Sequence, residues 1–159
     1  MSGASPADEK VVFRPHPNAR EVSRRVARLP LDYFVCRLIE HWIVVGPTGI
    51  FVVGRAGDDA ATTAGVTLSM AQRIRTELAN RIPWVPFIDA LIVGGDDDVS
   101  LPCTVVNIGT LEMALLSGPV AIDEVGMVQL RQHVPNVLEQ IHASAELDVV
   151  HADPARDTA

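Results

Sequence analysis

The strongest constraint on the fold of this chain is the stretch from Ile39 to Val53, IEHWIVVGPTGIFVV. It contains two apolar runs, 42–45 and 50–53, that are rich in the β-branched and aromatic residues favoured in strands. Gly46-Pro47-Thr48-Gly49 separates the runs, with a proline that presets φ and a glycine that tolerates positive φ. We therefore expect a β-hairpin. Because both runs are continuously apolar, we expect it to be buried on both faces, in the middle of a sheet covered by helices.

The remaining pattern predicts helices and further strands around this hairpin. Asn18 is a good N-cap for a first helix, and Glu21 follows three residues later, as in a capping box. A loop of small residues leads to a second helix, which Thr62 or Thr63 would cap. The expected elements are a helix at 19–29, a strand at 31–38, the hairpin, a loop at 54–65, a helix at 66–81, strands at 86–93 and 103–108, a short helix at 110–116, and a helix from 123 that Pro135 kinks or restarts. This order predicts an α/β sandwich in which a mixed sheet with a central β-hairpin is flanked by helices.

Length and composition predict one domain at 18–143, a disordered lead-in at 1–17 and an acidic flexible tail at 144–159. The first residues lack the basic and apolar parts of a secretory signal, and no apolar run is long enough to cross a bilayer, so we expect a cytoplasmic protein without membrane contact. Hydrophobic residues make up 48% of the chain, which motivates a homo-oligomer or a protein partner. Of 13 basic residues only Lys10 is a lysine, a bias typical of high-GC genomes.

The string 39–53 resembles the core motif of the nuclease-related domain, NERD, a branch of the PD-(D/E)-x-K restriction-endonuclease-like superfamily. Members typically read I-D-H, a hydrophobic strand, G-P-x-G and then V-F-V-I-E-x-K, and the fifteen positions here fit with conservative exchanges. Family members also begin with a helix that carries G-x-x-G-E, and Asn18-Ala19-Arg20-Glu21 keeps its glutamate. The order of elements is similar over residues 18–135. The resemblance implies a restriction-endonuclease-like mixed sheet.

The chain departs from this family at the residues that carry the family's chemistry. In the family the second strand of the hairpin runs into Glu-x-Lys: the acid and the earlier aspartate hold a divalent metal, and the lysine helps to activate the attacking water. Here Gly54, Arg55 and Ala56 stand at those positions, while Glu40 and Glu21 keep two of the acids. Phosphodiester hydrolysis needs charge stabilisation and a poised nucleophile, which the missing pair would supply. We therefore expect a vestigial site with no catalytic residues, no metal and no cofactor.

This pattern favours a catalytically inactive nuclease-like fold, a pseudoenzyme kept as an interaction or scaffold module. The alternative is a divergent metal-dependent DNA nuclease. In that case Glu21 and Glu40 would hold Mg²⁺, an ion that needs only one or two protein carboxylates. Arg55 would replace the lost cation, and either Asp58 or Asp59 would supply the missing acid.

A third hypothesis is non-catalytic DNA binding through the first helix. Arg20, Arg24 and Arg28 share one face at i, i+4 and i+8, and Arg25 lies beside them, so the four could contact a phosphate backbone. Charged helix faces are usually only solvated, and the formal net charge of the chain is −7. Nucleic acid is therefore a disfavoured partner.

Other polar residues give weaker signals. Glu40 and His41 are adjacent on a strand and point to opposite faces, so we expect a structural hydrogen bond and no acid–base pair. Asp96-Asp97-Asp98 lacks the spaced oxygen ligands of a calcium loop. The remaining candidates for zinc lack the spacing of a zinc site: His133 with His142, and Cys36 with Cys103.

Overall fold

The structure is a computed structural model that describes residues 17–38, 40–57, 59–94 and 102–151, with side chains as far as 143. Its elements are α2 (Ala19–Val26), β1 (Phe34–Leu38), β2 (His41–Gly46), β3 (Gly49–Arg55), α3 (Ala60–Ala79), β4 (Ile88–Val93), β5 (Thr104–Val106), a 3₁₀ turn η1 (Ile108–Thr110), α4 (Leu111–Leu116) and α5 (Glu124–His151). Several predictions lie outside the described residues: the lead-in before residue 17, the Asp58 acid, the loop at 95–98 and the tail at 152–159. Among the described helices, none combines the length and the apolarity that crossing a bilayer requires.

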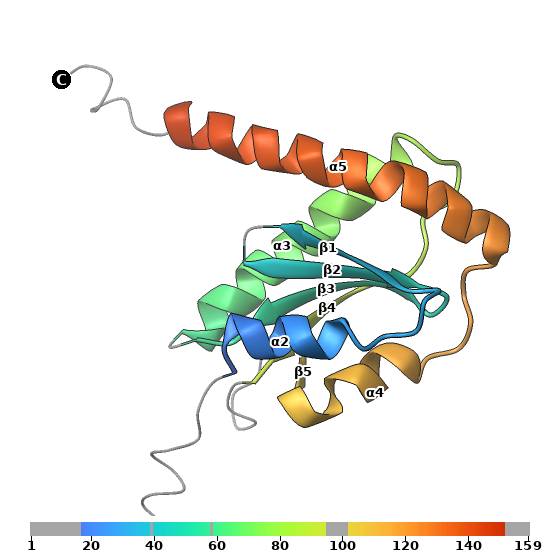
Figure 1. Cartoon of the computed structure of the whole chain (residues 1–159). Helices are drawn as coiled ribbons and strands as arrows, with labels where there is room; N and C mark the ends of the chain where they lie inside the picture. The colour runs from blue at the N-terminus through green and yellow to red at the C-terminus, as the bar shows by residue number, and fades with distance from the viewer. Residues whose placement is uncertain (1–16, 39, 58, 95–101, 152–159) are drawn as a thin grey trace, which may run out of the picture.

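The five strands form one mixed sheet in the order β1-β2-β3-β4-β5 (Figure 1). The first three strands are antiparallel neighbours, while β4 runs parallel to β3 and β5 runs parallel to β4. The predicted hairpin is the β2–β3 pair, which lies in the interior of the sheet. The predicted fold class, an α/β mixed sheet with a central hairpin flanked by helices, is confirmed.

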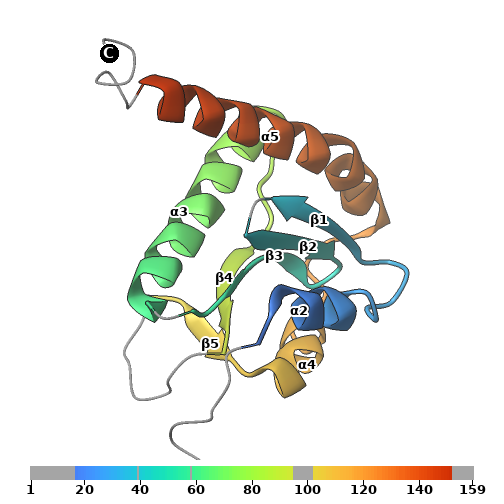
Figure 2. The same ribbon diagram turned by 60° about the vertical axis from the view of Figure 1, so that its left-hand side comes forward.

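Helices cover both faces of the sheet (Figure 2). On one face the apolar side chains of α3 and α5 pack on alternate strand residues such as Ile43 and Val52. On the other face α2 and α4 pack on the intervening residues, among them Trp42 and Phe51. The residues of β2 are all buried, as are those of β3 up to Gly54, so the prediction of burial on both faces is confirmed.

The hairpin turn joins the sheet to the C-terminal half of the chain. Gly46 pairs with Gly49, whose φ of 137° suits a glycine, so Pro47 and Thr48 form the tip. The Pro47 carbonyl accepts the amides of Ala121 and Ile122, at 2.7 and 3.0 Å. The turn that the sequence specifies locally therefore also fixes the path between α4 and α5.

Two boundaries near the N-terminus differ from the predictions. Asn18 and Glu21 form the predicted capping box, but α2 ends at Val26 and not at 29. Residues 27–33 make short i to i+3 bonds instead, including one from the Tyr33 amide to the Pro30 carbonyl. Pro30 disfavours helical backbone at Leu29, so α2 cannot continue past it, and the turn closed by the Tyr33 bond places the start of β1 at Phe34.

Two of the later helices, α3 and α5, are longer than predicted. α3 begins at Ala60, six residues early, because Asp59 and not a threonine is its N-cap. α5 is not restarted at Pro135, which is exposed, so water can reach the carbonyl that the proline leaves unbonded. It continues to His151, through residues that were predicted to be a flexible tail. Residues 143–151, ASAELDVVH, contain neither glycine nor proline and favour continuation of the helix.

Candidate functional site

The site expected from the sequence lies where the hairpin strands end. His41 pairs with Gly54, and β3 ends one residue later at Arg55. Ala56 continues the strand direction, with its amide bonded to the Val93 carbonyl at 2.9 Å. Gly54 and Ala56 therefore face α3, whereas the side chain of Arg55 lies on the opposite face.

The space beside Gly54 is filled. A Cβ atom at this position would lie 2.4 Å from Thr67 Oγ1, 3.2 Å from Ile92 Cδ1 and 3.4 Å from His41 Cδ2. The first distance is far below van der Waals contact, so the backbone of β3 approaches α3 more closely than any side chain at residue 54 would allow. Gly54 is thus explained by packing between a strand and a helix.

His41 and Thr67 close this space with a buried hydrogen bond. The Thr67 hydroxyl donates to the Thr63 carbonyl at 2.8 Å, so it accepts the proton of His41 Nε2, also at 2.8 Å. His41 Nδ1 is buried and has no partner among the described residues. Burial lowers the pKa of His41; Glu40 opposes that effect, and Arg37 adds to it. The neutral imidazole is therefore a structural group, as the sequence predicted for one member of the Glu40–His41 pair.

Ala56, at the position of the family's lysine, is also part of a packed cluster. It is fully buried against Ala64 of α3 and Ile92 of β4. A long charged side chain here would have to enter this cluster. Neither position of the Glu-x-Lys pair opens onto solvent.

Glu40 and Arg55 lie together on the other face of the sheet. Glu40 is exposed in the tight connection between β1 and β2, and its Oε2 lies 3.6 Å from Arg55 Nη2. Arg55 Nη1 also donates to the Pro17 carbonyl at 3.4 Å, just before α2. Arg55 therefore joins two loops on the α2 side, and Glu40 does not face Gly54.

The other two proposed acids cap helices. Glu21 Oε1 accepts the Asn18 amide at 3.3 Å and completes the capping box of α2. Asp59 accepts the Thr62 amide at 3.1 Å and the Thr62 hydroxyl at 2.6 Å, and these hydrogen bonds lower the pKa of its carboxyl. Each carboxylate thus satisfies backbone donors at a helix start, where acids are favoured.

These residues do not fit a magnesium site. Glu40 is paired with an arginine on the α2 face, whereas the positions of the missing acid and lysine, Gly54 and Ala56, are buried against α3. Across the described part of the chain, no group of three or more His, Cys, Asp and Glu side chains is placed to hold a metal ion. The alternative based on Glu21, Glu40 and Asp59 is therefore not supported by their placement.

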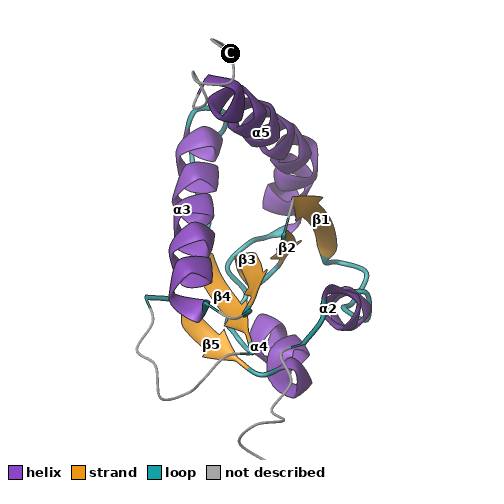
Figure 3. Ribbon diagram, turned by 90° about the vertical axis from the view of Figure 1, so that its left-hand side faces the viewer, coloured by secondary structure: helices purple, strands orange, loops and turns teal. Residues whose placement is uncertain are grey.

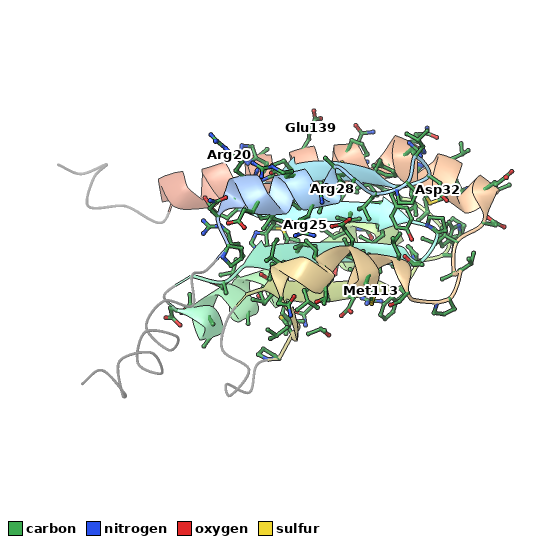
Figure 4. All side chains as sticks on the ribbon, turned by 60° about the horizontal axis from the view of Figure 1, so that its bottom comes forward. Arg20, Arg25, Arg28, Asp32, Met113 and Glu139 are labelled. Carbon is green, nitrogen blue, oxygen red and sulfur yellow. The ribbon has the colours of Figure 1, made fainter. Side chains whose placement is uncertain are left out.

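The arginines of the first helix are not equivalent. Arg25 is half-buried and its Nη1 lies 3.1 Å from Glu112 Oε1, so it links α2 to α4. Arg20, Arg24 and Arg28 are exposed, and the described residues contain no salt bridge to them. Figure 4 labels Arg20, Arg25 and Arg28 along this segment, with Met113 on α4 and Glu139 on α5. The predicted four-arginine surface is thus reduced to three.

A polar groove of about 500 Å³ was not singled out by the sequence. It lies between α3 and β4 and is lined by Gln72, Arg75, Asp89 and Cys103 among others. Burial raises the pKa of Asp89, and burial together with Asp89 raises the pKa of the Cys103 thiol, which donates to the Ala64 carbonyl. A thiol held in the protonated form is a poor nucleophile. The one sign of this groove in the sequence is Asp89, a charged residue within the apolar run of β4.

No family model, curated protein or solved structure matches this chain.

Proposed function

We propose that this chain is a non-catalytic, nuclease-like domain of the cytoplasm that works by binding protein, with a second copy of itself as one partner. The observation that carries the non-catalytic part is the contact between Thr67 and Gly54. A carboxylate at residue 54 would need a Cβ atom 2.4 Å from Thr67 Oγ1. Where a nuclease would mount its acid, this chain has a buried histidine–threonine hydrogen bond.

An exposed apolar surface supports the protein-binding part. Trp84, Val120 and Val125 line a groove of about 550 Å³ at the start of α5. Val120 and Val125 are 77% and 70% exposed, and Val128, one helical turn after Val125, is 65% exposed. The indole of Trp84 is held by a 2.8 Å hydrogen bond from its Nε1 to Gln129 Oε1. Apolar side chains clustered around a fixed aromatic ring are typical of a surface that binds protein.

The non-catalytic part is tested by incubating the purified chain with single-stranded and double-stranded DNA in Mg²⁺ or Mn²⁺. We expect no cleavage. Glu40→Ala is the matched control, because a contaminating nuclease would be unaffected by it. Cleavage that Glu40→Ala abolishes would overturn the proposal and restore the metal-dependent alternative.

The self-association is tested by light scattering on the full chain at micromolar concentration. We expect a mass of at least twice 17.1 kDa, because hydrophobic residues make up 48% of the chain. A monodisperse monomer would contradict the second copy as a partner, while leaving the conclusion about catalysis untouched.

A further inference from the structure

β1 is an edge strand with an unused side. Among the described residues it pairs with β2 alone, and Figure 3 shows it at the margin of the sheet between α5 and α2. In an antiparallel pair, every second residue directs its amide and carbonyl away from the partner strand. β1 therefore offers backbone groups to a further strand, as the edge strands used in β-augmentation do.

Two hollows lie along this edge, one on each face. The hollow on the α2 side, about 250 Å³, is lined by Val26, Val35, Arg37 and Trp42 among others. The hollow on the α5 side, about 350 Å³, is lined by Cys36, Leu38, Leu138 and Glu139 among others. Side chains of an added strand would alternate between the two faces and so enter both hollows in turn.

We propose that the added strand is residues 9–14 of a second copy of this chain, Glu9-Lys10-Val11-Val12-Phe13-Arg14, so that two copies exchange their N-terminal segments. This inference rests on the proposed self-association. Val11-Val12-Phe13 is the one apolar run in the first 17 residues, and its residue types favour strands.

The charges of the segment indicate which of its two faces meets each hollow. Lys10, Val12 and Arg14 share one face of an extended chain, and they complement the hollow that contains Glu139. Figure 4 shows Glu139 projecting from α5. Glu9, Val11 and Phe13 share the opposite face. Arg37 borders both hollows, but its guanidinium lies over the Trp42 ring, 4.1 Å from the ring centroid, so its positive charge is on the α2 side and complements Glu9.

The position of Pro17 indicates that the segment beside β1 comes from a second copy and not from the same chain. Arg55 and Gly94 hold Pro17 beside β3 and β4, whereas a strand beyond β1 lies three to four spacings away, about 14–19 Å. Residues 9–14 form the added strand, so only the three residue steps from Arg14 to Pro17 can cover this distance, and they span at most about 11 Å. The chain's own segment therefore falls short.

Disulfide trapping in the full chain tests the pairing. Lys10→Cys, Val12→Cys and Arg14→Cys place a thiol on the face of Cys36, whereas Val11→Cys and Phe13→Cys are matched controls on the other face. Under mild oxidation we expect at least one variant of the first set to form a covalent dimer at least fivefold more than either control. Adding Cys36→Ser should remove that dimer. Dimers that survive Cys36→Ser, equal yields from both sets, or a disulfide within one chain would each overturn the exchange.

Val12→Asp gives a second test, without a new thiol. It should convert the dimer to a monomer in light scattering and speed hydrogen exchange at the amides of Val35 and Arg37 at least tenfold. Val66→Asp, at an exposed apolar residue of α3, is the matched control and should leave the dimer intact. A dimer that survives Val12→Asp and is lost in Val125→Asp would assign self-association to the exposed apolar surface at the start of α5. That result would overturn this inference while preserving the proposed function.

Discussion

At the scale of single residues, the close approach of Thr67 to Gly54 determines what the end of the hairpin can hold. The hydroxyl of Thr67 occupies the place of a Cβ at residue 54, and it is fixed there by bonds to His41 and to the Thr63 carbonyl. Thr63 and Thr67 belong to α3, His41 to β2 and Gly54 to β3, so the hydroxyl cannot move aside without breaking a hydrogen bond between elements. Packing of this kind opposes even a methyl group.

Gly54→Ala should therefore destabilise the fold, by about 1–3 kcal/mol, because overpacking forces backbone or side-chain shifts. Chemical denaturation measures the change in the free energy of unfolding. Gly57→Ala is the matched control, since a Cβ at that position meets nothing within 4 Å. Equal effects of the two substitutions would contradict the close packing. In a double-mutant cycle, Thr67→Ala should recover part of the loss caused by Gly54→Ala, because it removes the colliding oxygen.

His41 should make stability depend on pH. Burial lowers the pKa of His41 below its ordinary value of 6.5, so the folded chain binds fewer protons than the unfolded chain as the pH falls through 6.5. The free energy of unfolding should therefore decrease as pH falls from 6.5 toward the lowered pKa, and be fully present above 6.5. Protonation would place a charge on Nδ1, which lacks a partner among the described residues.

The comparison with His41→Gln isolates this effect, because glutamine can still donate to Thr67 but does not titrate. Thermal melts between pH 7.5 and pH 5 should show a shallower decline in Tm for the variant than for the parent chain. Parallel declines would show that other groups cause the pH dependence.

At the scale of elements, the hairpin turn connects three parts of the chain through one hydroxyl. Thr48 Oγ1 donates to the Leu115 carbonyl at 2.7 Å and accepts from the Tyr33 hydroxyl, 2.9 Å away. Thr48 is buried, with 7% of its surface exposed, so water cannot replace these bonds. The turn thus holds the end of α4 and the approach to β1 in place.

Thr48→Val keeps the shape of the side chain but leaves the Tyr33 hydroxyl and the Leu115 carbonyl without their partner. We expect a loss of about 1–3 kcal/mol in the free energy of unfolding. Thr76→Val is the control, because Thr76 bonds only to the Gln72 carbonyl within its own exposed helix face. It should change stability by no more than about 0.5 kcal/mol. A Thr48 effect as small as the control would mean that the turn is held by the Pro47 carbonyl alone.

At the scale of the whole molecule, sequence reasoning succeeded where the chemistry is local. The hairpin follows from two apolar runs around Pro47, and the start of α2 follows from the capping box at Asn18. The layered sheet follows from the order of these elements. Features that depend only on residues near one another in the sequence could be predicted from the sequence alone.

The parts that could not be predicted depend on contacts between distant residues. Asp59, Thr62 and Thr63 can all cap a helix, and the start at Asp59 lets α3 run along both β3 and β4. The closed site depends on Thr67, which the sequence did not single out because nothing in a helix sequence reveals its proximity to Gly54. Arg25 likewise finds Glu112, 87 residues away in the sequence.

The exposed arginines of α2 form a positive patch that could bind DNA although the net charge of the chain is negative. Arg20, Arg24 and Arg28 are exposed, while the chain carries a formal net charge of −7. We expect short duplex DNA to bind only at low salt, with a slope of about −2.7 in log affinity against log salt, since each phosphate contact contributes about −0.9. Three phosphate contacts are few, so the loss of counterion release should remove this binding near physiological salt.

Fluorescence anisotropy over a salt series measures this slope. Arg24→Ala combined with Arg28→Ala should make the slope shallower by about 2, because two phosphate contacts are lost. Arg73→Ala combined with Arg75→Ala removes the same charge from the exposed surface of α3 and should leave the slope unchanged. If both double variants behave alike, binding follows total charge and not the α2 surface. If binding is unchanged at high salt, it does not depend on phosphate contacts, and DNA binding through the α2 arginines is contradicted.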